Sequence, residues 1–201
     1  MLRVGLTGGL ASGKSFVGEA LASLGCHLLK ADELGHQLLM PDTEVYRRVV
    51  EEFGSSILDE AGRINRRALA SLVFADPARL ARLNAIVHPA VIEEEERWMQ
   101  RVAAQDPHGI AIVEAAILIE TGSYRRFDRI VLAVCPLEQQ IERAMKRDGL
   151  SREEVLERLQ RQMPLEEKMK FADFIIDTSG EKEHTLIQVR RLYEELRRLA
   201  S

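Results

Sequence analysis

The sequence has 201 residues, of which 46% are hydrophobic, enough for one substantial core with additional segments. Its formal net charge of −4 argues against a nucleic-acid-binding protein and against a helix that lies on a membrane surface. No apolar run approaches the roughly 20 residues that span a bilayer, and Cys26 and Cys135 both lie in apolar stretches, so we expect a cytoplasmic protein with two buried thiols.

Short apolar runs alternate with helical patterns along the chain. The predicted strands are Leu2–Leu6, Cys26–Leu29, Ile110–Val113, Ile130–Cys135 and Phe174–Ile176. Because the first strand starts at once, we expect no cleavable signal. Helical spacing begins near Ser15 and is stopped by Gly25, and a long helix is predicted through Leu199. This alternation predicts an α/β fold with a parallel sheet and right-handed crossovers.

Two longer segments interrupt the alternation. Residues 33–107 show helical stretches and no convincing strand, and residues 138–172 are helical and crowded with charge. Pro89 is placed for the first turn of a helix. The remaining segments form the predicted core: residues 1–32, 108–137 and 173–201.

The first strand leads into a match to G-x-x-x-x-G-K-[ST], at Gly8 to Ser15, which a predicted helix follows. Glycines let the backbone N–H groups of such a loop converge on phosphate oxygens, and the helix adds the positive end of its dipole. We expect Lys14 to reach the β- and γ-phosphates and Ser15 to ligate Mg²⁺. A glycine-rich turn without a ligand is the alternative, but the strand, loop and helix together favour a nucleoside triphosphate site.

Three classes of nucleotide-binding protein commonly carry such a loop: GTPases, ATPase motors and metabolite kinases. Asp59 to Gly62 resembles the D-x-x-G element of GTPases, but a turn in the helical insertion explains it more simply, and no N-K-x-D motif follows. An ATPase motor usually needs a longer chain. A metabolite kinase needs a mobile basic lid that excludes water. The second insertion fits this need, with six basic residues in a span of nineteen: Arg143, Lys146, Arg147, Arg152, Arg158 and Arg161.

Arg143 and Arg147 are the strongest lid candidates. They lie four residues apart, so they share a helix face, and they follow the fourth strand. Ligands of such sheets bind beyond the strand ends, which favours a phosphate role for both. The alternative is a solvated helix face that pairs with neighbouring glutamates.

Two carboxylates follow or end predicted strands. Asp32 lies just beyond the second strand and could accept a hydrogen bond from an attacking hydroxyl. Alternatively, it caps a helix that begins at Glu33. Glu114 ends the third strand, where it could hold a Mg²⁺-bound water or merely cap the strand end.

The ordered set of motifs resembles the dephospho-CoA kinase family over almost the whole chain. The phosphate loop alone specifies only a superfamily, whereas the set is specific. Beyond that loop the matching stretches are A-D at Ala31, F-G at Phe53, G-R-I-N-R-R-A-L from Gly62, V-F at Val73, N-A-I-V-H-P from Asn84, E-A-A-I-L-I-E from Glu114, K-R-D-G-L-S-R-E-E from Lys146, Q-M-P from Gln162, and A-D-F-I-I-D-T-S-G from Ala172.

The resemblance implies a P-loop kinase core with a five-stranded parallel sheet in the order 2-3-1-4-5. It implies a helical acceptor-binding domain at 33–107 and a helical lid at 138–172. The implied reaction moves the γ-phosphoryl group of ATP to the ribose 3′-hydroxyl of dephospho-CoA, with Mg²⁺, giving ADP and CoA in the last step of coenzyme A biosynthesis. The implied partners are small molecules, with no nucleic acid or membrane, and the chain is expected to be a monomer or weak homo-oligomer.

The family pattern makes Asp32 the catalytic carboxylate, and we expect Lys14 and Arg143 to act with it by neutralising phosphate charge. The acceptor-side residues are Asp32, Arg66, His88 and Pro89. The metal residues are Ser15 and, through water, Glu114. The ATP-binding residues are Gly8, Gly9, Ala11, Ser12, Gly13, Lys14, Ser15, Phe16, Arg143, Arg147 and Thr178.

Five residues depart from the family pattern. Lys30 stands where an aspartate is common, and Ala116 where a proline is typical. Ala11 replaces a common glycine, which predicts that this loop position avoids a positive φ. Phe16 replaces a threonine but keeps its N–H for the α-phosphate, and Thr178 replaces an asparagine near the expected adenine site.

Two other interpretations stay open. One is another small-molecule kinase, such as a nucleoside-monophosphate kinase. The other is a nucleotide-dependent regulatory module that keeps the loop but lacks turnover. Formation of ADP that depends on dephospho-CoA would separate all three.

Overall fold

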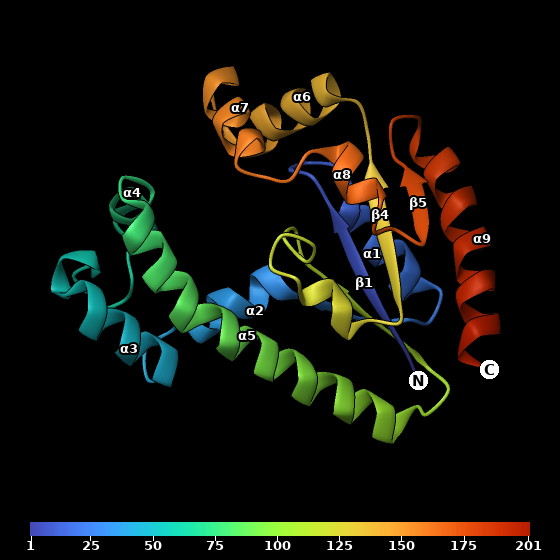
Figure 1. Cartoon of the computed structure of the whole chain (residues 1–201), viewed down its shortest axis with the longest axis horizontal. Coiled ribbons are helices and arrows are strands. Elements are labelled where there is room, and N and C mark those ends of the chain that lie inside the picture. Colours follow the sequence, from blue (N-terminus) through green and yellow to red (C-terminus); the bar gives the residue numbers. More distant parts are fainter. The chain divides into compact units, whose positions relative to one another are not determined.

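The computed structural model describes residues 1–201 and divides into two units. The first comprises Met1–Lys30 and Met99–Ser201, and the second comprises Ala31–Trp98. Figure 1 labels the α-helices and the strands β1, β4 and β5. None of the helices combines the length and the apolar character needed to cross a membrane.

The first unit is built on a five-stranded sheet in the order β2-β3-β1-β4-β5, in which every neighbouring pair is parallel. This confirms the predicted fold class and strand order. The strands are β1 (Leu2–Gly8), β2 (His27–Lys30), β3 (Ile110–Glu114), β4 (Arg129–Val134) and β5 (Phe174–Asp177). Every residue of β3 is buried, as expected for a central strand of a parallel sheet.

Helices α1 (Lys14–Ser23) and α9 (Lys182–Ala200) pack together on the sheet, and a hydrophobic cluster that includes Leu6, Val17 and Leu192 joins them to β1. Both were predicted. The other elements of this unit are the 3₁₀ helix η2 (Ser123–Arg126), α6 (Leu137–Asp148), α7 (Arg152–Gln160), α8 (Leu165–Met169) and the last part of α5 (Pro77–Gln105). Figure 1 shows α6 and α7 as neighbouring orange helices.

The second unit is helical, and the helical stretches predicted within residues 33–107 are present, although the unit itself runs from Ala31 to Trp98. Its elements are α2 (Ala31–Leu38), α3 (Glu44–Phe53), the 3₁₀ helix η1 (Ser55–Ile57), α4 (Arg66–Phe74) and most of α5. A separate core built on Val49, Ile57 and Val73 holds them together. Side-chain oxygens cap two of the helices: Thr43 accepts the N–H of Tyr46, and Asn65 accepts those of Arg67 and Ala68.

Pro89 lies in the interior of α5, so its prediction as a residue of a first helical turn was wrong. A proline there has no N–H to donate to the carbonyl of Ala85, a loss that usually ends or kinks a helix. The residues around it compensate, because Ile86, Val87 and Ala90 pack against the core of the second unit. Tertiary packing therefore keeps one helix through this position.

Candidate active site

The phosphate loop joins β1 to α1, and its glycines are required by close contacts. Gly13 has φ +85°, and a Cβ there would lie 2.9 Å from the hydroxyl of Thr178. A Cβ at Gly8 would lie 2.7 Å from the carbonyl oxygen of Ala133. A side chain at Gly9 would meet the amide oxygen of Gln140 at 2.6 Å. The neighbours of the loop therefore fix its path.

The loop and the first turn of α1 present a row of N–H groups that donate no hydrogen bond within the protein. They belong to Ala11, Gly13, Lys14, Ser15 and Phe16. The first N–H groups of a helix have no partner inside the helix, and together with the helix dipole they bind anions. Lys14 adds a positive charge that forms neither a hydrogen bond nor an ion pair.

Ala11 adopts a left-handed conformation with φ +54°, so the prediction that this position avoids a positive φ was wrong. The positive φ belongs to the turn that the loop makes between β1 and α1. Ala11 tolerates it at a cost of about 1–2 kcal/mol, and its methyl group packs against the lid cluster of Ile141, Ala144 and Val155.

A cavity of about 510 Å³ opens over the loop and is lined by Ala11 to Phe16 together with Arg143, Lys146 and Arg147 of α6. The structure therefore brings both predicted lid arginines to the loop. Arg143 donates to the carbonyl oxygen of Thr178 at 2.7 Å and to its hydroxyl at 3.2 Å. Arg147 donates to both carboxylate oxygens of Asp148, and these hydrogen bonds lower the pKa of that carboxyl group.

Thr178 follows β5 and is buried. Its hydroxyl donates to the carbonyl oxygen of Ser12 at 2.7 Å, so it ties the end of β5 to the phosphate loop. The Thr178 side chain, which replaces an asparagine of the family pattern, therefore forms its hydrogen bonds within the protein.

Ser15 and Glu114 meet beside the loop. The Ser15 hydroxyl donates to Oε1 of Glu114 at 2.5 Å, and Oε2 of the same buried carboxylate has no hydrogen-bond partner. A buried carboxylate oxygen without a partner is costly unless a ligand satisfies it. Mg²⁺ typically takes one or two protein oxygens and completes its shell with waters and substrate phosphates, so these two residues fit it. No cluster of three or more His, Cys, Asp or Glu side chains offers a fuller metal site.

Three further departures from the family pattern have simple contacts. Lys30 pairs with Glu19 of α1 at 2.8 Å. The Phe16 ring lies 5.7 Å from the ammonium group of Lys182. Ala116 forms its hydrogen bonds through its backbone: its carbonyl oxygen accepts from Lys168 at 3.2 Å and from the hydroxyl of Thr7 at 3.3 Å.

The second unit carries the predicted acceptor residues. Asp32 is exposed and is the second residue of α2, which begins at Ala31, so its alternative reading as the cap of a helix starting at Glu33 was wrong. A carboxylate in a first helical turn is favoured by the dipole. Arg66 begins α4, and His88 and Pro89 lie in α5.

His36 was missed by the sequence analysis. Its Nε2 lies 2.6 Å from a guanidinium nitrogen of Arg66. Partial burial and the charge of Arg66 lower the pKa of His36, which suits the neutral ring as the acceptor in this contact. One feature of the sequence could have indicated it: His36 lies four residues after Asp32, so the two residues share one face of a helix. Burial also lowers the pKa of His88.

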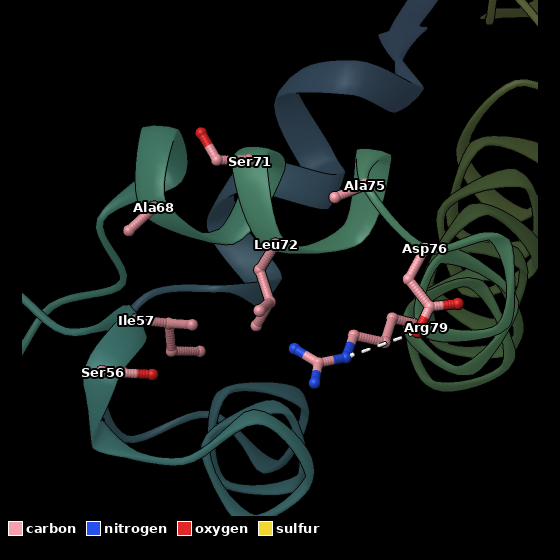
Figure 2. Close-up of a pocket in the computed structure, with 8 residues that line it drawn as sticks. All are labelled: Ser56, Ile57, Ala68, Ser71, Leu72, Ala75, Asp76 and Arg79. Atoms are coloured by element: carbon pink, nitrogen blue, oxygen red, sulfur yellow. Dashed lines mark ion pairs between the residues drawn. The ribbon is translucent and has the colours of Figure 1, made fainter.

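A cavity of about 540 Å³ in the second unit contains none of the predicted site residues (Figure 2). Its charged groups, Asp76 and Arg79, pair with each other at 3.6 Å. Its other lining residues are Ser56, Ile57, Ala68, Ser71, Leu72 and Ala75. The chemistry predicted from the motifs lies elsewhere.

Comparison with known proteins gives one consistent family. The family model described as dephospho-CoA kinase matches residues 2–184. A dephospho-CoA kinase of Aquifex aeolicus is 42% identical over 198 residues, covering 98% of this chain and 99% of that protein.

Two solved structures superpose on almost the whole chain. The protein TT1252 of Thermus thermophilus superposes with a TM-score of 0.82 at 34% identity, covering 96% of each chain. The dephospho-CoA kinase of Campylobacter jejuni superposes with a TM-score of 0.74 at 26% identity, covering 99% of this chain and 98% of that one.

Proposed function

This chain belongs to the dephospho-CoA kinase family, enzymes of the ATP-dependent phosphorylation of dephospho-CoA that completes coenzyme A biosynthesis, and we propose how its parts divide that reaction. The core segments 1–32, 108–137 and 173–201 bind ATP. The helical segment 33–107 binds dephospho-CoA, and the segment 138–172 closes as a lid. The main support is the row of backbone N–H groups that donate no hydrogen bond within the protein. These groups line the same cavity as Lys14, Arg143 and Arg147.

The phosphates of ATP lie along the loop in this proposal. The N–H groups of Ala11 and Gly13 to Phe16 donate to phosphate oxygens, and Lys14 sits on the β- and γ-phosphates. Arg143 and Arg147 add charge from the lid side, where they already line the cavity. Since phosphoryl transfer passes through a loose transition state, positioning and charge neutralisation of this kind supply most of the catalysis.

Ser15 and Glu114 would hold Mg²⁺, Ser15 directly and Glu114 through a bound water. When bound, the ion neutralises charge on the phosphate oxygens. The buried, unpartnered Oε2 of Glu114 supports this assignment.

Asp32 orients the attacking ribose 3′-hydroxyl and accepts its proton late in the reaction. Its exposed carboxylate makes no hydrogen bond within the protein, so it is available to a substrate hydroxyl. Arg66, His88 and Pro89 belong to the acceptor side, and the guanidinium group of Arg66 suits the diphosphate of dephospho-CoA.

We place the enzyme in the cytoplasm as a monomer or weak homo-oligomer. The thiols of Cys26 and Cys135 are buried and unbridged, which suits a reducing compartment.

The direct test is ADP formation by the purified chain with ATP and Mg²⁺ and, in parallel, dephospho-CoA, AMP or shikimate as acceptor. Of the three acceptors, we expect only dephospho-CoA to support turnover, and we expect the product to carry the new phosphate on its 3′-hydroxyl. Comparable turnover with AMP or shikimate would favour another small-molecule kinase. Nucleotide binding without turnover on any acceptor would favour a regulatory module.

A further inference from the structure

Two glutamine side chains of the predicted lid segment reach the crest of the phosphate loop, which we define as Gly9 and Leu10. Gln162 follows α7, and its Oε1 accepts the N–H of Leu10 at 2.9 Å. Gln140 of α6 is 7% exposed, and its Oε1 approaches Gly9 so closely that a side chain there would collide with it. The crest is therefore held from the lid side.

The Leu10 N–H differs from its neighbours in the loop. The N–H of Ser12 donates to the carbonyl oxygen of Gly9 at 3.1 Å, and those from Gly13 to Phe16 donate to nothing within the protein. Leu10 alone in this stretch donates to a side chain. Since Leu10 precedes Ala11, whose φ is positive, the hydrogen bond to Gln162 fixes the peptide that leads into the strained turn.

Gln162 is itself anchored by the residues that follow it. The N–H of Met163 donates to Oε1 of Glu120 at 3.2 Å, and the ammonium group of Lys168 pairs with the same oxygen at 2.8 Å. The Lys168 side chain is 1% exposed and also donates to the carbonyl oxygen of Ala116.

This anchor leads back to the loop. The Ala116 carbonyl oxygen also accepts the hydroxyl of Thr7, at the end of β1, where the loop begins. A continuous set of contacts thus runs from β1 through the segment after β3 to Gln162 and returns to the loop at Leu10.

We propose that Gln162 is a positioning residue for phosphoryl transfer, which holds the Leu10 peptide so that the neighbouring free N–H groups are aligned before ATP binds. The proposal rests on the phosphate role proposed above for the loop. Donors that are already aligned need no reorganisation during the reaction, and this is where electrostatic catalysis gains most. Loss of the Gln162 amide oxygen therefore lowers kcat and leaves the affinity for dephospho-CoA unchanged.

The test uses Gln162→Met, which keeps the length of the side chain but removes its amide oxygen. Gln160→Met is the matched control, because Gln160 is exposed, its side chain makes no hydrogen bond, and it lies two residues away. Amide hydrogen exchange of the nucleotide-free protein, followed by NMR, reports on Leu10 directly. We expect exchange at Leu10 to speed up about three- to tenfold in Gln162→Met, the usual effect of one lost hydrogen bond, and to stay at the parental rate in the control.

Gln162→Glu is the conservative variant, since it keeps an acceptor oxygen at the same reach and should restore the slow exchange at Leu10. In the same proteins, kcat is expected to fall about three- to tenfold in Gln162→Met, with the KM for dephospho-CoA at the parental value. A parental exchange rate at Leu10, or a parental kcat, in Gln162→Met overturns the proposal.

The failure of the loop assignment would look different. If Lys14→Ala turned over ATP at the parental rate, the loop would not be the phosphate site, whatever Gln162 does. If Lys14→Ala were inactive and Leu10 exchange were unaffected by Gln162→Met, only the positioning role would fail.

Discussion

At the scale of single residues, the phosphate loop combines strain with unused hydrogen-bonding capacity. Ala11 holds a left-handed backbone, and Lys14 forms no ion pair within the protein. Oε2 of Glu114 is buried without a partner. Groups of this kind are costly to folding, and the proposed binding of a triphosphate with its cation would use each of them.

Ala11→Gly is expected to stabilise the nucleotide-free chain by about 0.5–1 kcal/mol. Glycine removes the left-handed strain of about 1–2 kcal/mol. It also raises the conformational entropy of the unfolded chain, which offsets part of this gain in stability. Ala81→Gly is the matched control, because Ala81 is an exposed residue within α5, and there the same change should destabilise by about 1 kcal/mol. Chemical denaturation of the three proteins measures both differences. Equal destabilisation by the two changes would show that Ala11 is not strained.

At the scale of elements, the proposed lid segment differs in how its helices are held, with exposed ion pairs on α6 and α7 and a buried contact on α8. Helices α6 and α7 carry the arginines and exposed ion pairs such as Arg152 with Glu138 at 2.8 Å. Helix α8 is fixed by the buried contact of Lys168 with Glu120. If the proposed lid closes over a nucleotide, we expect α6 and α7 to move and α8 to stay in place.

Hydrogen exchange with a saturating, non-hydrolysable ATP analogue tests this division. Peptides from α6 and α7 should gain protection as the arginines contact the triphosphate, and peptides from α8 should be protected equally with and without it. Unchanged exchange in α6 and α7 would leave them as solvated helices with no lid function.

The anchor itself can be tested through stability. Lys168→Met leaves the Glu120 carboxylate buried beside Lys168 without its partner, and we expect a loss of about 3–5 kcal/mol in the free energy of unfolding. The double variant with Glu120→Gln removes that unpaired charge and should recover much of the loss. Denaturation that gives the double variant no advantage over Lys168→Met would contradict the role of the pair.

Local patterns predicted most of the fold, because apolar runs and helical spacing report directly on burial. They failed where a distant contact decides the outcome. Pro89 stays inside α5 because its neighbours pack on the core of the second unit, and Ala11 takes the φ that the curvature of the loop demands. Helix α2 starts at Ala31, two residues before the start at Glu33 that the interpretation of Asp32 as a cap required.

Within the candidate site, the phosphate loop and the lid arginines had strong signals of spacing and charge. Gln162 lies in a stretch that matches the family pattern, but an uncharged amide shows no spacing or charge that indicates a role, and its partner Leu10 lies 152 residues away in the sequence. Such contacts follow from the topology of the sheet, so only the structure could supply them.

At the scale of the whole molecule, the proposed reaction uses side chains from both units. The first unit supplies the phosphate loop, and the second supplies Asp32 on α2. The carboxylate of Asp32 makes no hydrogen bond within the protein. A change at Asp32 should therefore lower turnover strongly and affect the stability of the fold only slightly.

The most direct test of this account is the kcat of Asp32→Asn for ATP and dephospho-CoA, measured beside Glu33→Gln, which removes a charge from the same helical turn. Both changes weaken the interaction with the helix dipole by about 0.3–1 kcal/mol, so their stabilities should be similar. The account predicts a fall in kcat of about 10²–10⁴-fold in Asp32→Asn, with ATP affinity at the parental value, and near-parental kcat in Glu33→Gln. Parental turnover in Asp32→Asn would remove this carboxylate from the mechanism and contradict the account.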